Sequence, residues 1–191
     1  MRIIGGEFSG RSLATGIDGR QSRGLRPTST RARTVMFDLL THGARGNHVV
    51  GARVLDLFSG TGALGIEALS RGATYAAFVD RQRLARRVIC RNIANVGMES
   101  QTAVLQCDAS RLGDNTDSVF SLMFLDPPYQ QSGLAELSVL SAVAGDWIRP
   151  GSVVVAETPS PLRMKDCLSL IAERRVGLAW IGIFVVSAES R

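Results

Sequence analysis

Short apolar runs alternate with longer, mixed segments along most of the chain after Val54. The runs are typical of buried strands, and the mixed segments have the spacing of amphipathic helices. They predict strands at 53–57, 75–80, 102–107, 120–125 and 152–157, and helices near 63–71, 82–96, 133–144 and 161–172. Strands that alternate with helices form parallel sheets, so the pattern predicts a doubly wound α/β fold with helices on both faces of a mostly parallel sheet.

Both ends of the chain depart from this alternation. At the N-terminus we expect, in order, a small β-hairpin, a flexible link and a helix, over residues 2–15, 16–27 and 29–40. Near the C-terminus, Val, Ile, Trp and Phe surround Gly177 and Gly182 over 174–187, which predicts two strands that close the sheet as a hairpin. The chain is long enough to bury one full core, and we divide it into an N-terminal extension, 1–45, and a main domain, 46–191.

The most informative stretch of the sequence is Asp126-Pro127-Pro128-Tyr129, which follows a buried apolar run. Prolines have fixed φ and donate no backbone hydrogen bond, so the strand must stop there and the loop is stiff. Asp126 and nearby carbonyl oxygens can accept both hydrogens of an exocyclic amine, and the ring of Tyr129 can stack on a base. The alternative is a plain proline turn, but all four residues after a buried strand indicate a catalytic loop that holds an amine.

A second motif, from Val54 to Gly65, runs from an apolar strand through a glycine turn into a helix. Its glycines match the dinucleotide pattern GxGxxG, which alone is weak because a plain strand-turn-helix uses the same glycines. The acid Asp56 would repel a pyrophosphate near the turn, but it favours the sulfonium and ammonium groups of S-adenosylmethionine. We therefore predict a cofactor site for S-adenosylmethionine that includes Asp56, Phe58, Ser59, Gly60 and Gly62.

Two more acids follow the next two apolar runs. Asp80 lies about twenty residues past the glycines, the distance at which an acid reaches the hydroxyls of a ribose. Asp108 is placed to accept the amino group of the cofactor adenine while the amide of Ala109 meets a ring nitrogen. Each acid alone would more often be a helix N-cap or a turn former. However, Asp56, Asp80, Asp108 and Asp126 all follow strands, and ligands of open α/β sheets bind at the carboxyl ends of strands.

The positive charge of the chain is concentrated at its N-terminus. The sequence has 22 Lys and Arg against 17 Asp and Glu, a net charge of +5. Seven arginines lie within the first 33 residues against Glu7 and Asp18, and 7 − 2 = +5, so the rest of the chain is neutral overall. A segregated arginine cluster indicates nucleic acid, although a merely solvated tail is the simpler alternative. The predicted RNA contacts are Arg2, Arg11, Arg26, Arg31 and Arg33.

Other classes of protein are disfavoured by the composition. The three cysteines have neither metal-ligand nor disulfide spacing, and the two histidines have no partner at ligand spacing, so we expect no metal site. No apolar run approaches membrane-spanning length, and the N-terminus has no apolar core of signal-peptide type. We therefore expect a cytoplasmic protein with reduced thiols and no membrane partner.

These motifs together resemble the class I S-adenosylmethionine-dependent methyltransferases, and closely the RsmD-type family that methylates guanine N2 in bacterial 16S ribosomal RNA. The resemblance covers nearly the whole chain, and its motifs are 2–6 with 10–11, 25–28 with Arg31 and Arg33, and 60–73. The chain departs from the family at Thr30 and Thr34, where acidic residues usually flank the two arginines. It departs again over 16–24, which is longer than the family's connection.

We expect a monomer. The resemblance implies a sheet of seven strands with one antiparallel strand, and an enzyme that acts on guanine 966 of 16S RNA, within a 30S particle or an assembly intermediate. It also implies that Asp126 and the Pro127 carbonyl hold the amine while Tyr129 stacks on the flipped base. An adenine-N6 methyltransferase uses the same loop, but the N-terminal motif and the lack of a separate target-recognition domain argue against it. Asp56 and the proline loop disfavour an NAD-binding oxidoreductase, and the four acids disfavour a catalytically silent RNA-binding protein.

Overall fold

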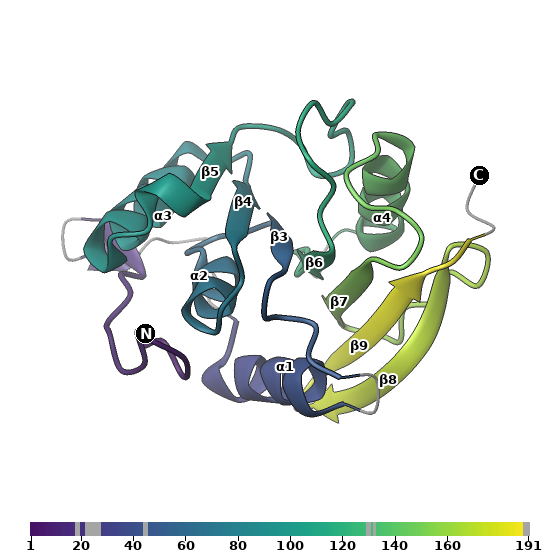
Figure 1. Ribbon diagram of the computed structural model, residues 1–191, viewed down its shortest axis with the longest axis horizontal. Coiled ribbons are helices and arrows are strands. Elements are labelled where there is room, and N and C mark those ends of the chain that lie inside the picture. The colour runs from purple at the N-terminus through teal and green to yellow at the C-terminus, as the bar shows by residue number, and fades with distance from the viewer. Residues whose placement is uncertain (18–19, 22–27, 44–45, 129–130, 132, 189–191) are drawn as a thin grey trace.

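The computed structural model of this chain describes residues 1–17, 20–21, 28–43, 46–128, 131 and 133–188. Its centre is a seven-stranded sheet with the order β5-β4-β3-β6-β7-β9-β8 (Figure 1). The strands are β3 (Arg53–Leu57), β4 (Tyr75–Val79), β5 (Thr102–Leu105), β6 (Leu122–Leu125), β7 (Val153–Thr158), β8 (Leu168–Val176) and β9 (Ala179–Val186). Strands β3 to β7 pair in parallel, and β9 is antiparallel to both of its neighbours. The expected doubly wound, mostly parallel sheet is therefore confirmed.

Helices cover both faces of this sheet (Figure 1). They are α1 (Thr30–His42), α2 (Ala63–Ser70), α3 (Arg83–Val96) and α4 (Leu134–Ala144), with a single 3-10 turn, η1 (Glu99–Gln101), before β5. One hydrophobic cluster contains side chains of the first three helices, and the cluster on the other face contains those of α4. Within the described residues, no helix combines the length and the hydrophobicity needed to cross a membrane.

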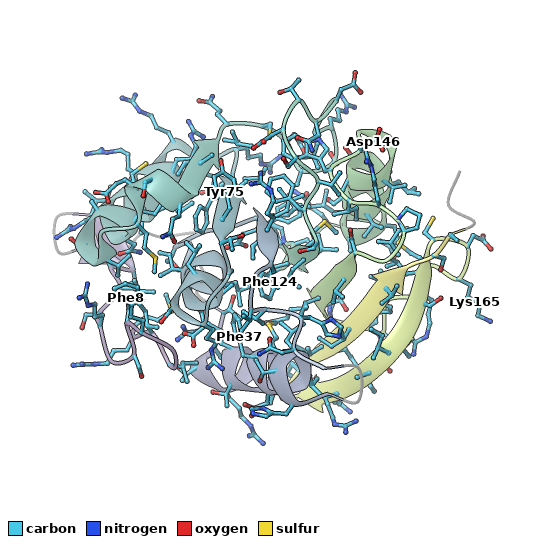
Figure 2. All side chains as sticks on the ribbon, in the orientation of Figure 1. Phe8, Phe37, Tyr75, Phe124, Asp146 and Lys165 are labelled. Carbon is cyan, nitrogen blue, oxygen red and sulfur yellow. The ribbon has the colours of Figure 1, made fainter. Side chains whose placement is uncertain are left out.

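The alternation of side chains along each strand decides which acids lie on the same face of the sheet. In β3, Val54 belongs to the cluster on the side of α1 and α2, whereas Leu55 and Leu57 belong to the opposite cluster. Successive side chains of a strand point to opposite faces, so Asp56 points to the side of α1 and α2. The same alternation in β6, where Phe124 lies in the first cluster, places Asp126 on that side as well. The aromatic ring of Phe124 contacts that of Phe37 on α1, with ring centroids 5.6 Å apart (Figure 2).

The sheet has its topological switch point between β3 and β6. The chain leaves β3 toward β4 and β5, and then returns to the other side of β3 through β6. The loops that follow β3 and β6 therefore diverge, and a crevice opens between them at the carboxyl ends of the strands. Two of the predicted acids, Asp56 and Asp126, lie at this point.

The helix expected over 161–172 is wrong, because residues 161–167 form a loop and a turn rather than a helix. Residues 168–176 form strand β8, which pairs antiparallel with β9 and has a register shift between Leu170 and Ala172. In the sequence, Met164, Leu168 and Ile171 have the spacing of a helix face, but the free edge of β9 offers backbone partners that override this local preference. The expected C-terminal hairpin is confirmed, with its turn at Gly177, whose φ of 62° favours glycine.

The N-terminal extension differs from the expected hairpin and flexible link. Over 2–15 there is only a single bridge, between Arg2 and Ser12, in a loop closed by backbone hydrogen bonds. The expected link contains two short paired strands, β1 (Gly16–Ile17) and β2 (Arg20–Gln21). The expected helix is confirmed as α1, and the hydroxyl of Ser29 caps it by accepting a hydrogen bond from the amide of Ala32.

Glu67 ties this extension to the main domain. Every residue of α2 is buried, so its single carboxylate needs partners inside the protein. Oε2 accepts a hydrogen bond from the amide of Ile4 at 2.7 Å, and Oε1 accepts from the amide of Gly5 and from Nε of Arg71, both at 2.8 Å. The guanidinium of Arg33 lies 3.7 Å from Oε2. One buried carboxylate therefore connects the first loop, α1 and α2.

Arg33 is a structural residue, and its predicted contact with RNA is wrong. Its side chain is 0% exposed, and Nη2 donates a hydrogen bond to the carbonyl of Arg2 at 2.9 Å. Burial lowers the pKa of Arg33, and Glu67 raises it in opposition. Side chains of the extension, such as Ile3, Leu13 and Phe37, also belong to the core cluster of the main domain. The boundary drawn at residue 45 therefore does not separate two cores.

We expect Glu67→Gln to lower the free energy of unfolding by about 3 kcal/mol, because Arg33 would remain as a buried charge without its partner. The control is Glu99→Gln, which changes an exposed glutamate in η1 and should alter stability by less than about 0.5 kcal/mol. Urea denaturation of the wild type and both variants measures the difference. If Glu67→Gln were as stable as the wild type, the buried pair would not hold the extension in place.

Candidate functional site

A cleft of about 660 Å³ lies at the carboxyl ends of the strands, over the switch point. It is lined by the loops after β3, β4, β5 and β6, by the start of α1 and by the turn between β8 and β9. Of the residues predicted from the sequence, it brings together Asp56, Phe58, Ser59, Gly60, Asp80, Asp108, Ala109, Asp126, Pro127 and Pro128. Gly62 lies behind this lining as the N-cap of α2, and Tyr129 is outside the described residues.

The turn after β3 is built from unusual backbone conformations. Phe58 has a φ of 59°, which is rare for a residue with a bulky side chain. The turn is held by the hydroxyl of Ser59, which donates to the carbonyl oxygens of Asp56 and Val79. Gly65 is required by close packing, since a Cβ there would lie 2.4 Å from Cε1 of Phe78. The absence of a side chain lets the start of α2 approach the end of β3.

This close approach places a backbone donor on Asp56. The amide of Gly65 donates to Oδ2 of Asp56 at 3.0 Å, and the carboxyl group is only 1% exposed. The pKa of Asp56 is raised to about 8: burial is the main cause, the bond from Gly65 opposes it, and the nearby charges of Asp126 and Asp80 add to the rise. The site therefore favours either a proton on Asp56 or a cation close to it.

Asp80 connects two of the loops that line the cleft. Its Oδ2 accepts from the amide of Gly60 at 3.0 Å, and its Oδ1 accepts from the amide of Gln82 at 2.8 Å. The carboxylate thus links the β3–α2 turn to the start of α3 while it lines the cleft. Each carboxylate oxygen can accept more than one hydrogen bond, so hydroxyl groups of a ligand can still be bound.

Asp108 is more exposed than Asp56 and Asp80, and it lies beyond the end of β5 rather than at it. Its Oδ1 accepts from the amide and the hydroxyl of Ser110, at 2.9 and 2.8 Å. These two bonds lower the pKa of Asp108, burial opposes them, and Arg81 adds to the lowering from 3.9 Å. Asp108 therefore shapes its own turn, and it stays ionised beside the buried Ala109.

The predicted catalytic loop meets the N-terminal extension. Thr28 Oγ1 donates a hydrogen bond to Oδ2 of Asp126 at 2.7 Å. Thr28 precedes α1, whose first residues Ser29 and Ala32 also line the cleft. The extension therefore reaches the carboxylate that the sequence singles out for catalysis, a contact that sequence reasoning did not predict.

Sequence reasoning also missed Glu157, a fifth acid in the cleft. In the register of β6 and β7, Leu125 is opposite Ala156, so Glu157 lies level with Asp126 on the neighbouring strand. Glu157 is 7% exposed and has the same parity as Val153 and Val155, which face α1 and α2. The signal was present, because Glu157 ends an apolar run as the other acids do. Three further lining residues, Gln82, Gln131 and Leu178, carry no comparable sequence signal.

The remaining predicted RNA contacts lie on the surface where they are described. Arg2, Arg11 and Arg31 are exposed, and Arg26 is outside the described residues. Arg2 donates to the carbonyl of Gly10 at 2.9 Å. The guanidinium of Arg11 lies over the ring of Phe8, 4.7 Å from its centroid, and reaches the carbonyl of Val96 at 3.5 Å. Their contact with RNA stays a prediction.

Comparison with known proteins places this chain in a family. The family model described as conserved hypothetical protein 95 matches residues 1–185. The chain is 31% identical over 158 residues to ribosomal RNA small subunit methyltransferase D of Escherichia coli K12, covering 83% of this chain and 74% of that protein. Over 184 residues it is 29% identical to the protein of the same name from Haemophilus influenzae, covering 93% of this chain and 90% of that one.

The similarity extends to three dimensions. A methyltransferase candidate of Escherichia coli, yhhF, has a TM-score of 0.80 to this chain at 28% identity, and the match covers 98% of both chains. The N-terminal extension and the closing β8–β9 hairpin therefore belong to the shared structure. The seven-stranded α/β sheet is therefore that of a Rossmann-like methyltransferase fold.

Asp56 should make the stability of the unliganded protein depend on pH. Its pKa is about 8 in the folded protein against an ordinary value of 3.8, so between these values the folded state keeps a proton that the unfolded chain has released. Stability therefore falls as the pH rises through this window, and the loss is complete above about pH 8. Asp56→Asn cannot ionise, so its stability relative to the wild type should increase from about pH 5 to about pH 8. Urea denaturation across this range measures both proteins, and a constant difference would contradict the assignment.

Proposed function

The chain belongs to the family described as conserved hypothetical protein 95, the RsmD-type methyltransferases, and from this premise we propose that it transfers a methyl group from S-adenosylmethionine to N2 of a guanine in 16S ribosomal RNA. The observation that carries the proposal is the meeting of Asp56 and Asp80 with the Asp126-Pro127-Pro128 loop in one cleft. The names of the relatives in Escherichia coli and Haemophilus influenzae support ribosomal RNA as the substrate class.

The residues present fit S-adenosylmethionine by their charge. Asp56 is buried, and its pKa is raised to about 8 mainly by burial and further by two nearby acids, so a cation beside it would favour its ionised form. Asp80 is placed for ribose hydroxyls, and Asp108 with the amide of Ala109 for the adenine edge. When bound, S-adenosylmethionine supplies an electrophilic methyl group on a sulfonium. A dinucleotide would instead bring its pyrophosphate toward the same acids, and the repulsion disfavours the oxidoreductase alternative.

The chain's own contribution to the reaction is to hold the amine. The nitrogen lone pair of a guanine amine is delocalised into the ring, so the amine is a poor nucleophile. Because Pro127 and Pro128 have no N–H, the loop offers acceptors only: the Asp126 carboxylate and the Pro127 carbonyl. Two acceptors hold both amine hydrogens, turn the lone pair toward the methyl, and stabilise the positive charge that develops on nitrogen. Asp126 need not be a strong base, because the amine becomes acidic as it is methylated.

Thr28 has a role in this arrangement through its bond to Asp126. The hydroxyl fixes Oδ2 of Asp126 at 2.7 Å and so orients the carboxyl plane. Since Thr28 belongs to the extension, docking of the extension and positioning of the catalytic group are coupled. We propose Thr28 as a positioning residue.

Glu157 favours guanine over adenine as the target. It lies level with Asp126 on the adjacent strand and lines the same cleft. Guanine presents a ring N–H beside its amine, whereas adenine presents a ring acceptor at the corresponding place. A second carboxylate beside Asp126 can accept the guanine N–H but would meet the adenine nitrogen with no hydrogen to share. This supports guanine-N2 over the adenine-N6 alternative.

The experiment that tests the proposed function is methyl transfer from labelled S-adenosylmethionine to deproteinised 16S RNA and to 30S particles, followed by mass mapping of the modified nucleotide. We expect one labelled guanine that carries the methyl on N2. A label on adenine N6 would favour the alternative. If neither form of the RNA were labelled, the proposal would be wrong.

Asp126→Ala should lower the turnover rate on the order of a hundredfold or more, since a positioned acceptor for the developing charge is lost. Cofactor affinity should stay within about twofold, because we assign this carboxylate to the target amine. The control is Asp38→Ala, which removes an exposed acid from the middle of α1. Calorimetry and a transfer assay on the same preparations test this, and near-normal turnover in Asp126→Ala would remove Asp126 from the mechanism.

Asp80→Ala should have the opposite effect. We expect it to weaken S-adenosylmethionine binding by about 1.5–3 kcal/mol through lost hydrogen bonds to the ribose and a loosened β3–α2 turn. The rate at saturating cofactor should change much less. Calorimetric titration of the cofactor together with saturation kinetics separates the two effects, and an unchanged dissociation constant would exclude Asp80 from the cofactor site.

A further inference from the structure

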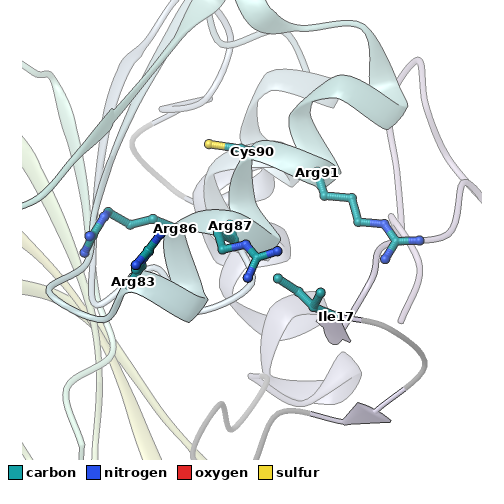
Figure 3. A pocket seen from close by; sticks show the side chains of 6 residues that line it. All are labelled: Ile17, Arg83, Arg86, Arg87, Cys90 and Arg91. Carbon is teal, nitrogen blue, oxygen red and sulfur yellow. The ribbon is translucent and has the colours of Figure 1, made fainter.

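Helix α3 carries a row of exposed arginines on the outer surface of the molecule. Arg83, Arg87 and Arg91 follow one another at intervals of four residues, so they lie on one side of the helix about 6 Å apart along its axis. We call these three residues the arginine ridge. With Arg86 and Cys90 they surround a hollow of about 370 Å³, whose opposite wall is Ile17 of β1 (Figure 3).

The net charge of the chain does not reveal this ridge, because acidic residues elsewhere cancel its positive charge. Residues beyond Arg33 have 22 − 7 = 15 basic and 17 − 2 = 15 acidic side chains, so their net charge is zero. Within that neutral part, residues 81–98 contain five arginines and no aspartate or glutamate. This short segment therefore carries as much positive charge as the whole N-terminal extension.

The arginines are placed where they do not help the helix. The first turn of α3 has no acidic residue, and Gln82 makes no side-chain cap, so Arg83 and Arg87 lie toward the positive end of the helix dipole. Arginines four residues apart also repel one another. Departures of this kind from local preferences are expected mainly at functional or strained sites.

The contrast with Arg86 shows which arginines have a structural role. Arg86 donates to the carbonyls of Asp80 and Arg81 and to Oε1 of Gln106, at 3.1, 2.9 and 2.7 Å. In the part of the chain that the structure describes, the three ridge arginines have neither an ion pair nor a hydrogen bond from their side chains. Their charge is available to a partner from outside.

The ridge adjoins the segment that leads into the cleft. Arg11 reaches the carbonyl of Val96 at the last residue of α3, and Ile17 packs beside the ridge arginines. Farther along the same extension, Thr28 bonds to Asp126 in the cleft. The extension therefore passes the ridge before it reaches the catalytic carboxylate. An RNA strand bound on this side of the molecule could contact the ridge and the cleft together.

We propose that the arginine ridge and the Ile17 hollow form a second RNA-binding surface, which holds backbone phosphates of the substrate outside the cleft. This proposal rests on the proposed function, because it takes 16S RNA as the ligand. A row of guanidinium groups suits a run of phosphates, whereas a single small anion would need groups that converge on one point. The wall formed by Ile17 and the thiol of Cys90 is weakly polar, which suits the face of a ribose or an unstacked base.

The test is a triple variant, R83Q/R87Q/R91Q, compared with a matched control, R149Q/K165Q/R174Q. The control removes the same charge from exposed residues, and Lys165 lies on the opposite side of the molecule from α3 (Figures 1 and 2). RNA affinity is measured for both variants and the wild type over a range of salt concentrations. Loss of three phosphate contacts should make the slope of log affinity against log salt shallower by about 2 in the ridge variant. The control slope should stay close to that of the wild type.

Kinetics separate the ridge from the catalytic cleft. The ridge variant should have a higher KM for RNA, with kcat at saturating RNA and cofactor affinity unchanged. Equal slopes for the ridge and control variants would overturn the ridge proposal while the proposed function stands. If the wild type neither bound nor methylated 16S RNA, the proposed function itself would be wrong.

A measurement on the unmutated protein gives a second test. Cys90 is exposed beside the ridge, whereas Cys167 lies in the loop before β8 and serves as an internal reference. Saturating 16S RNA should slow alkylation of Cys90 several-fold and leave Cys167 unaffected, as read by mass spectrometry of the labelled peptides. If RNA left the rate at Cys90 unchanged, the hollow would not be a binding surface.

Discussion

The structure depends on the crowding of carboxylates at one edge of its sheet. Asp56, Asp80, Asp126 and Glu157 line the same cleft, and Asp56 is so deeply buried among acids that its pKa rises to about 8. Such an arrangement is unfavourable for an empty protein, because buried like charges repel and lose their hydration. The repulsion and the lost hydration arise at the switch point, where a bound ligand can offset them. Under the proposed function, a cationic cofactor would offset the repulsion at Asp56, and the amine that accepts the methyl group would bind the acceptors of the loop at Asp126.

The carboxylate of Glu67 is also buried, but its surroundings differ from those of Asp56. It is fully enclosed, but two amides and two arginines surround it, so its charge is compensated inside the protein. Through these partners the first loop and α1 are packed on α2, and α1 begins next to the cleft. The bond from Thr28 to Asp126 is therefore a consequence of how the extension is anchored. The extension is part of the site as well as a carrier of positive charge.

The sequence predicted most of the sheet, because apolar runs of strand length leave few alternatives, and it predicted the cleft because strand ends in a parallel sheet converge. It predicted β8 as a helix, because the pairing edge of β9 is not visible in local spacing. It assigned Arg33 to RNA, because nothing in an arginine cluster shows which member will meet a buried glutamate such as Glu67. Glu157 was missed although it ends an apolar run as Asp80 does, because the strand that it ends has no recognised motif beside it. The α3 ridge was missed because net charge summed over a long segment hides five arginines within residues 81–98.

Binding of a cationic cofactor should displace the proton of Asp56 into the solvent. Calorimetric titration of S-adenosylmethionine near pH 7, in two buffers of different ionisation enthalpy, tests it directly. With a pKa of about 8, Asp56 is mostly protonated in the unliganded protein at this pH. The account predicts release of close to one proton for each cofactor bound, and no such release in Asp56→Asn. Binding with the same heat in both buffers would contradict it.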